Sequence, residues 1–409
     1  MTAVVAATGP DAGLAWHLGD PLGEQRRLAG GGGVVDLSNR DVVTLAGPDR
    51  LRYLDLMTTQ RFGGLAAGAA TAAFFLDAQG HILCHFHAVV GDPVFGWTEP
   101  GQGKELADRL ERGKFRLAVT VEHRPDVALL WTRGGDVAGS LDVGSGVGVA
   151  GPLDVRAGVG VAETLAHGAG RASRVVDVAG PLAEGVGVDS RGVDVAGALA
   201  HRAGADSRVV GVAGTLAVRS GVDLAGALAV RSGVDSLGGS EVFWPRARLA
   251  EVTPTAGTWA YEALRVAAGL PRVGVDTDHR TLPNELGVPS PALVLDKGCY
   301  PGQETVARVH NLGHLPRRLA RVHLDGSAET LPEPGTPLVD PHGQEVGRLG
   351  AAAYHWELGP IALALVQRGA DDRTPLTAAG VPAALERLVD PDQGLHFAAP
   401  RRLGRPAQK

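Results

Sequence analysis

The segment LDKGCYPGQETVARVHN, residues 295–311, contains one of only two cysteines in this 409-residue chain. If the backbone before the cysteine is extended, Lys297 and Cys299 lie on one face, because the side chains of a strand alternate with a period of two. The following Tyr-Pro-Gly-Gln run matches a type II turn, in which proline supplies the fixed φ and glycine the positive one. A helix with Glu304 in its first turn is predicted to begin directly after this turn.

This setting favours a reactive thiol at Cys299. A nearby lysine and a helix N-terminus both lower the pKa of a cysteine and make its thiolate available as a nucleophile or metal ligand. Gly298 and Gly302 would leave room for another molecule to approach closely. The alternative is a small buried cysteine beside a structural turn, since free cysteines are commonly buried. The residues alone leave both interpretations open.

The other cysteine, Cys84, lies in a segment of alternating polarity, HILCHFHAVV at residues 81–90. The alternation places Cys84 on the apolar face, with Ile82, Phe86 and Ala88, so we predict a core position for it. The opposite, solvated face carries three histidines, namely His81, His85 and His87. Two or three histidines can bind zinc, but histidines on a solvated strand need no metal, and we predict no metal site.

Composition limits the function classes. Hydrophobic residues make up 44% of the chain, which is ample for a core, and the net charge of −6 provides no basic field for nucleic acid. Two cysteines suit a reducing cytoplasm. The first 20 residues lack the pattern of a secretory signal, and no apolar run approaches the roughly 18 residues needed to span a bilayer. We therefore expect a cytoplasmic protein without nucleic-acid or membrane partners.

The N-terminal third indicates an α+β domain. Residues 1–33 are polar and end in AGGGG, which predicts a flexible segment. In residues 34–133, VVDLSNRDVVTLAG predicts a hairpin that turns at Ser38-Asn39-Arg40, and TAAFFLDAQGHILCHFHAVV predicts a second one. Amphipathic helices are predicted in GPDRLRYLDLMTTQ and GQGKELADRLERGKF. Hairpins that alternate with helices are typical of α+β domains rather than of parallel doubly wound sheets.

Residues 134–240 have a different character. VDVAGALA, VGVAGTLAVRSG and VDLAGALAVRSG are near copies, and no aromatic residue occurs between Thr132 and Phe243. The spacing of the copies is irregular, and large side chains that could fill a solenoid are missing. We predict a glycine-rich repeat insertion that is mostly disordered, with a small β-solenoid as the alternative.

The remainder of the chain contains two further parts. In residues 241–315, GTWAYEALRVAAG predicts a helix. A polar loop then carries three candidates for acid–base chemistry, although charged loops are usually just solvated: Asp276, Asp278 and Glu285. Residues 316–400 alternate short strands with turns, which predicts a small all-β barrel or sandwich. Four basic residues after the cysteine could hold an anionic ligand tail, namely Arg308, His310, Arg317 and Arg318.

The run KGCYPGQETVAR, residues 297–308, resembles the K-G-C-[YF]-x-G-Q-E motif of the YgfZ family, folate-binding proteins that support iron–sulfur proteins. That family is related to the aminomethyltransferase (T-protein) of the glycine cleavage system. The likeness covers residues 34–133 and 241–400, but not the repeats. It implies an α+β, T-protein-like folate-binding fold, with mixed α/β domains around a central channel for tetrahydrofolate and a small C-terminal β-barrel.

The resemblance also implies site residues. The motif cysteine is the residue whose loss matters most in the family, and it matches Cys299, with Lys297 as the second catalytic candidate. The other motif positions match Gly298, Tyr300, Gly302, Gln303 and Glu304. An aromatic folate contact in the helix before the AGLP turn matches Tyr261. A second aromatic contact matches Arg40, where arginine could pair with the glutamate tail of folate, and Arg308 is a further cofactor-binding candidate.

Three hypotheses follow. The first is a non-enzymatic, tetrahydrofolate-binding accessory protein for [4Fe–4S] proteins, with iron–sulfur client or assembly proteins as partners and Cys299 as the functional thiol. The second is a folate-dependent aminomethyl or methyl transferase. Two differences argue against aminomethyl transfer, because T-proteins lack the motif cysteine and have a Glu-Ala-Gly run where this chain has Ala267-Ala268-Gly269. The third is a degenerate scaffold whose insertion mediates contacts.

Overall fold

The computed structural model divides into two compact units, formed by Met1–Ala138 with Leu216–Lys409 and by Gly139–Thr215. The residues that it describes are 3–133, 159–163, 174–178, 186–188, 227–232, 237–287, 292–313, 315–327 and 330–390. The predicted disorder of the repeat insertion falls mainly on residues outside this set. In the second unit, three short strands form an antiparallel sheet in the order β10-β11-β12, with bounds Val159–Glu163, Arg174–Val178 and Val186–Val188.

The first residues of the chain differ from the flexible segment that we predicted. They form β1 (Val4–Val5), β2 (Ala15–His17) and α1 (Pro21–Ala29). Helix α1 begins where the Asp20 side chain accepts a hydrogen bond from the Gly23 amide at 2.9 Å. The fully buried Glu24 carboxylate accepts the amide of Gly257 at 2.8 Å, which attaches this segment to the start of α5 (Thr258–Ala267).

Two sheets form the body of the first unit. One has the order β13-β14-β9-β3, with bounds Ala229–Ser232, Ser240–Pro245, Val127–Arg133 and Gly33–Asp36. The other has the order β5-β6-β7-β4-β8, with bounds Ala70–Leu76, Ile82–Val89, Val94–Thr98, Asp41–Ala46 and Thr120–His123. The strands β3 and β4 belong to different sheets, so the hairpin that we predicted at Ser38-Asn39-Arg40 is wrong. The chain passes from one sheet to the other at that turn.

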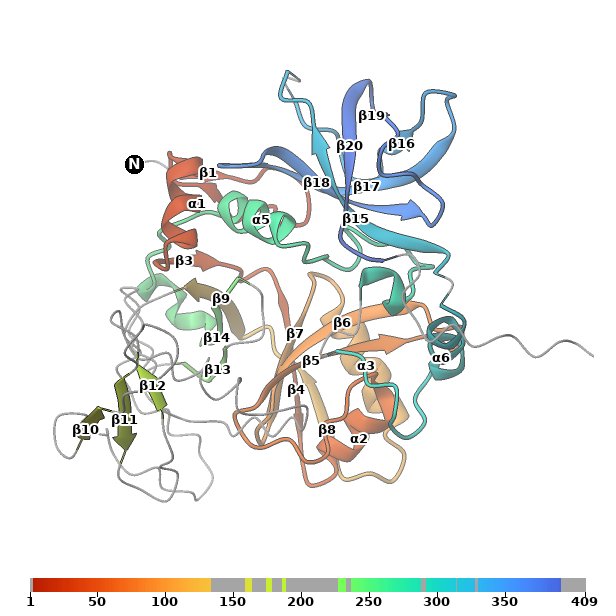
Figure 1. Ribbon diagram of the computed structural model, residues 1–409. Coiled ribbons are helices and arrows are strands. Elements are labelled where there is room, and N and C mark those ends of the chain that lie inside the picture. The colour runs from red at the N-terminus through yellow and green to blue at the C-terminus, as the bar shows by residue number, and fades with distance from the viewer. Residues whose placement is uncertain are drawn as a thin grey trace, which may run out of the picture. The chain divides into compact units, whose positions relative to one another are not determined.

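The second sheet has one face covered by two helices, α2 (Arg50–Met57) and α3 (Gly103–Gly113) (Figure 1). Tyr53, Leu54 and Leu110 pack there against Cys84 and Phe86. Cys84 is therefore a core residue, as predicted. Ile82 does not share this core, because a β-bulge between Phe75 and Leu76 shifts the strand register.

The C-terminal β-barrel is confirmed. Six antiparallel strands close in the order β15-β18-β17-β16-β19-β20, with bounds Arg317–Leu324, Gly359–Gln367, Glu345–His355, Pro337–Val339, Leu376–Ala378 and Val381–Arg387 (Figure 1). Closure leaves no unpaired strand edge. Within the described part of the chain, no helix combines the length and the apolar character that a membrane span requires.

Candidate functional site

The cysteine motif forms a bent loop followed by a tight turn. Residues 295–298 are bends rather than strand, so Lys297 and Cys299 are not placed by strand alternation as we predicted. The type II turn is confirmed, because Gly302 has φ +78° and ψ −1° and the Gln303 amide donates to the Tyr300 carbonyl at 3.3 Å. Helix α6 (Gln303–Leu312) begins at the predicted residue.

Lys297 fastens this loop to the connection between α2 and β5. Its Nζ donates hydrogen bonds to the main-chain carbonyls of Thr58, at 2.8 Å, and of Gln60. The ammonium also lies 5.3 Å from the centre of the Tyr300 ring, within the range of a cation–π interaction. The Gln303 side chain donates in turn to the Lys297 carbonyl at 3.2 Å. The lysine therefore fixes the position of the loop through hydrogen bonds to these two carbonyls.

The Lys297 amine should titrate near pH 8. Burial lowers its pKa to about 8, although the Asp55 carboxylate acts in the opposite direction. The unfolded chain therefore binds more protons than the folded one between that pH and the ordinary lysine value of about 10.4. The contribution of Lys297 to stability consequently rises with pH across this window and is lowest below it. The chain has only four lysines, so ¹³C-methylated protein followed by NMR can resolve them.

We expect one lysine resonance with a midpoint near pH 8, and its absence from a Lys297→Arg sample identifies it. A Lys297 midpoint at the ordinary lysine value, about 10.4, would contradict the environment described here.

Gly302 lies against the turn of the β5–β6 hairpin. A Cβ at this position would stand 2.6 Å from the Gly80 Cα and 2.7 Å from the Asp77 carbonyl oxygen, both far below van der Waals contact. Gly80 has no side chain either, and a Cβ there would meet Thr305 at 3.0 Å. Two glycines thus allow two turns from distant parts of the sequence to touch. The prediction identified Gly302 but missed Gly80, although the Asp-Ala-Gln-Gly run already indicated its turn.

Cys299 is exposed, whereas Cys84 is buried and burial raises the pKa of its thiol. Next to Cys299, a Cβ on Gly298 would meet no atom within 4 Å. The thiol therefore projects from an open stretch of loop whose two flanks, Lys297 and Gly302, are fixed. This excludes the alternative that Cys299 is a buried packing residue.

The histidine face of β6 is only partly solvated, because His81, His85 and His87 are each half-buried. The rings of four residues form a continuous row: Phe74 and His85 are 4.4 Å apart, His85 and His87 3.9 Å, and His87 and Trp97 4.0 Å with nearly parallel planes. Burial, aided by the Arg231 guanidinium, lowers the pKa of His85 to about 3 and that of His87 well below its usual value. Both imidazoles are therefore neutral at neutral pH.

Two ring nitrogens in this row lack a hydrogen-bond partner. The Nε2 atom of His85 and the Nδ1 atom of His87 are inaccessible to solvent and make no hydrogen bond within the described residues. Trp97, directly opposite His87 in the β6–β7 register, donates instead to Glu241 at 2.6 Å. The sequence prediction missed Trp97, because its position beside His87 depends on strand register. His81 stands apart from the row and pairs with Asp77 at 2.9 Å.

The predicted folate contacts have varied surroundings. Arg40 is buried and donates to Asp11 at 2.9 Å, while its Nε atom lies 3.5 Å from Glu99 and makes no hydrogen bond in the described residues. Tyr261 is buried with its ring edge-on to Trp131 at 5.4 Å. Arg308 is exposed on α6 and pairs with Glu304 at 2.6 Å. Arg40 lies near the histidine row, where its positive charge helps to lower the pKa of His87. Arg308, in contrast, lies on the surface.

The polar loop that we expected to be solvated is held by ion pairs. Asp276 is buried, and its carboxylate accepts a hydrogen bond from the Arg265 guanidinium at 2.8 Å. Arg317, expected to bind a ligand tail, contacts Asp278 at 2.6 Å and Glu285 at 2.9 Å. Its neighbour Arg318 is fully buried, donates to the Ala370 carbonyl at 2.9 Å and pairs with Asp372. Arg317 thus connects the loop to the barrel, whereas the Nε and Nη1 atoms of Arg318 are buried without a hydrogen bond among the described residues.

Tyr300 adds another buried, unpartnered atom. Its hydroxyl makes no hydrogen bond among the described residues, and burial raises its pKa to about 12. Across those same residues, no group of three or more His, Cys, Asp or Glu side chains could hold a metal ion.

Comparison with known proteins assigns the fold. The C-terminal residues 317–388 match the model of the CAF17 C-terminal β-barrel domain. The glycine cleavage system aminomethyltransferase T of Bartonella henselae superimposes with a TM-score of 0.60 over 96% of this chain and 95% of its own, at 15% sequence identity. The chain has the T-protein fold.

One curated relative adds a sequence match. It is a chloroplastic protein of Arabidopsis thaliana whose name assigns it to the transferases, and it is 35% identical over 117 residues. The match spans 27% of this chain and only about a quarter of the relative, 24% of its length. Together with the barrel match, this sequence match supports a T-protein-like chain. It covers only part of either protein.

Proposed function

We propose that this chain is a tetrahydrofolate-binding accessory protein of the YgfZ type, which supports assembly or maintenance of [4Fe–4S] proteins through Cys299. The observation that carries this proposal is an exposed thiol on a loop whose flanks are fixed. Lys297 and Gly302 anchor the KGCYPGQE motif, while the space beside Gly298 is open. A thiol displayed in this way suits contact with a macromolecular partner.

The partly buried ring row suits the pterin of a folate. A pterin is a flat aromatic ring with amide-like donors and acceptors, and it can stack on aromatic faces while it hydrogen-bonds to neutral groups. The unpartnered nitrogens of His85 and His87 offer such groups beside the rings of Phe74 and Trp97. When bound, tetrahydrofolate supplies a carrier for one-carbon units.

Arg40 suits a neutral part of this cofactor better than the carboxylate tail. Its charge is already balanced by Asp11 and Glu99, and those carboxylates would repel another anion. The Nε–H donor of Arg40 is nevertheless free of a hydrogen bond in the described residues. A carbonyl oxygen or ring nitrogen would satisfy it.

Cys299 cannot hold a cluster alone. A [4Fe–4S] cluster generally takes four ligands, and Cys84, the other cysteine of the chain, is buried in the core. The remaining ligands would come from a partner, or the cluster would stay with the client while Cys299 reacts with it or with a nearby thiol. The partner is therefore proposed to be an iron–sulfur client or assembly protein.

Complementation tests this proposal. Cells that lack their endogenous protein of this type would receive the chain or its Cys299→Ala variant, and the activity of a [4Fe–4S] enzyme would be measured. We expect the intact chain to restore activity and Cys299→Ala to leave it at the level of the empty vector. The control is Asp296→Ala, which changes an exposed side chain of the same loop and should rescue fully.

Equal rescue by the intact chain and Cys299→Ala would show that the thiol is dispensable. If neither the intact chain nor the control rescues, although both are folded, the iron–sulfur role is wrong.

A folate-dependent one-carbon transferase is the second candidate. The fold shared with an aminomethyltransferase favours it. The replacement of the acidic residue by Ala267 opposes it, since this methyl side chain can neither accept nor donate a proton. Production of methylenetetrahydrofolate from an aminomethyl donor, at equal rates in the intact chain and Cys299→Ala, would support the transferase.

A further inference from the structure

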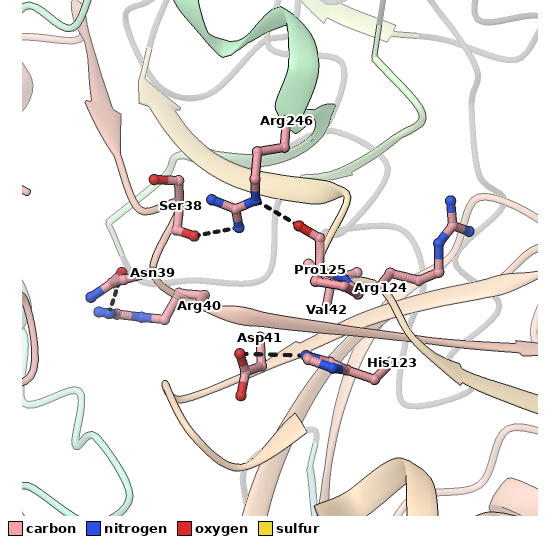
Figure 2. Close-up of a pocket in the computed structure, with 9 residues that line it drawn as sticks. All are labelled: Ser38, Asn39, Arg40, Asp41, Val42, His123, Arg124, Pro125 and Arg246. Atoms are coloured by element: carbon pink, nitrogen blue, oxygen red, sulfur yellow. Dashed lines mark hydrogen bonds and ion pairs between the residues drawn. The ribbon is translucent and has the colours of Figure 1, made fainter. Parts of the chain in front are cut away.

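A pocket of about 250 Å³ lies away from the cysteine motif, between the β3–β4 turn, the β8–β9 turn and the start of the 3₁₀ helix η2 (Arg246–Glu251) (Figure 2). At roughly 30 Å³ per water, this volume corresponds to about eight water molecules. Drug-sized ligands generally occupy larger clefts. The pocket therefore suits a small molecule.

Arg246 is held rigidly at this pocket. Its Nε donates to the Pro125 carbonyl at 2.7 Å, and its Nη2 donates to the Ser38 carbonyl at 2.7 Å (Figure 2). Nη2 also donates to the Val127 carbonyl at 3.2 Å. Among the described residues, Nη1 donates no hydrogen bond and no carboxylate lies within ion-pair distance of Arg246. A fixed guanidinium thus retains two N–H donors at Nη1, while its charge also helps to lower the pKa of the Asp126 carboxyl.

The other two arginines of the pocket are already paired. Arg124 donates to both carboxylate oxygens of Asp126, at 2.9 and 2.7 Å. Arg40 is balanced by Asp11 on the far side of the turn. The positive potential of the pocket therefore arises mainly from Arg246.

The pocket also carries an imidazole and a carboxylate. Nε2 of His123 lies 3.6 Å from Oδ1 of Asp41 (Figure 2). Oδ2 of Asp41 accepts a hydrogen bond from the Gly103 amide at 2.8 Å. A Cβ on Gly103 would lie 2.4 Å from the Asp41 Cβ, so the glycine lets the start of α3 approach this pair. Asp41 is thereby engaged by α3 and His123, and His123 is left as a second polar group for a ligand.

We propose that this pocket binds the carboxylate or phosphate group of a small anion through Nη1 of Arg246, with His123 as a second hydrogen-bond donor. Guanidinium groups bind both kinds of oxyanion with charge-assisted hydrogen bonds, and a preorganised guanidinium loses less freedom on binding. Asp41 repels negative charge, which directs the anionic group to the Arg246 side. Arg40 lines this pocket and is also a proposed folate contact, but the two donors used here, Arg246 and His123, are not among the proposed folate contacts.

Calorimetric titration of the full chain tests the proposal. Inorganic phosphate and glutarate would be added separately at constant ionic strength maintained with chloride, so that the two arms distinguish the phosphate and carboxylate sources. We expect binding in at least one arm, weakened about tenfold or more by Arg246→Gln, because a charge-assisted bond is lost. The matched control is Arg248→Gln, which removes the same charge two residues away, from a side chain bound to Glu251. It should bind as the intact chain does.

A second variant keeps the test decisive if Arg246→Gln fails to fold. His123→Gln leaves the carbonyl contacts of Arg246 in place and should weaken binding several-fold. No binding in either arm, equal weakening by Arg248→Gln, or unchanged binding in His123→Gln would each overturn the proposal.

Discussion

Replacement of Arg272 by alanine is expected to lower the free energy of unfolding by about 3–5 kcal/mol, because it leaves buried carboxylates without their partner. Arg272 is 4% exposed and contacts three carboxylates, those of Asp11 at 3.0 Å, Glu99 at 2.8 Å and Glu262 at 2.9 Å. These groups come from the N-terminal segment, from the end of β7 and from α5. A single guanidinium thus joins three parts of the first unit.

The remaining arginines cannot compensate for this loss. Burial alone would raise the pKa of Asp11, but Arg40 and Arg272 together hold it below its usual range. Without Arg272, Asp11 would depend on Arg40, and Glu262 on Arg265 at 2.6 Å. Each carboxylate would then remain buried with less than its full set of donors.

Denaturant unfolding, followed by circular dichroism, measures the effect as a shift in midpoint. Arg308→Ala is the control, because it removes an exposed pair with Glu304 and should change stability by no more than about 0.5 kcal/mol. The stability of Arg272→Lys should lie between those of Arg272→Ala and Arg308→Ala, since lysine retains the charge of arginine but not its forked geometry. A loss of less than about 1 kcal/mol in Arg272→Ala would mean that the network contributes little net stability.

Gly302→Ala is expected to destabilise the chain by about 2–4 kcal/mol. A left-handed conformation costs a non-glycine residue roughly 1–2 kcal/mol, and overpacking against backbone typically adds 1–3 kcal/mol. The neighbouring atoms here are the Gly80 Cα and the Asp77 carbonyl oxygen, which belong to the backbone and cannot rotate away. The loop that carries Cys299 should therefore detach from the β5–β6 turn.

The motif contains its own control for this experiment. Gly298→Ala places a methyl group where no atom lies within 4 Å, so its unfolding midpoint should stay close to that of the unmodified chain. In the complementation assay, Gly302→Ala should also lose activity, whereas Gly298→Ala tests only the space around the thiol. Equal stability of the two variants would contradict the close contact between the turns.

Local patterns in the sequence predicted much of this architecture. The β5–β6 hairpin, α3, the type II turn and the strands of the barrel each depend on residues close together in the chain, where periodicity and turn chemistry act directly. The T-protein fold was inferred from one motif and its flanks, and the superposition over nearly the whole chain agrees with it. The exposure of Cys299 was one of two possibilities that the residues left open.

Errors arose where distant residues decide the outcome. Ser38-Asn39-Arg40 has the composition of a hairpin turn, but β3 pairs with β9 and β4 pairs with β7 and β8. The charged loop was expected to be solvated. Its carboxylates are instead paired with arginines that lie elsewhere in the sequence, such as Arg317, and the loop sequence alone does not reveal these partners. Likewise, His85 and His87 face Phe74 and Trp97 from neighbouring strands, and strand register cannot be inferred from one segment.

The sheet β13-β14-β9-β3 gives this chain a natural attachment point. The chain leaves the sheet at Arg133 and re-enters it at Ala229, two strands further along and level with Leu129, so the exit and entry points are separated by roughly 16 Å. Both points belong to strands that pair only within this sheet. Any module whose termini lie about that far apart, such as a fluorescent reporter, could replace the intervening residues without a change to the cysteine loop.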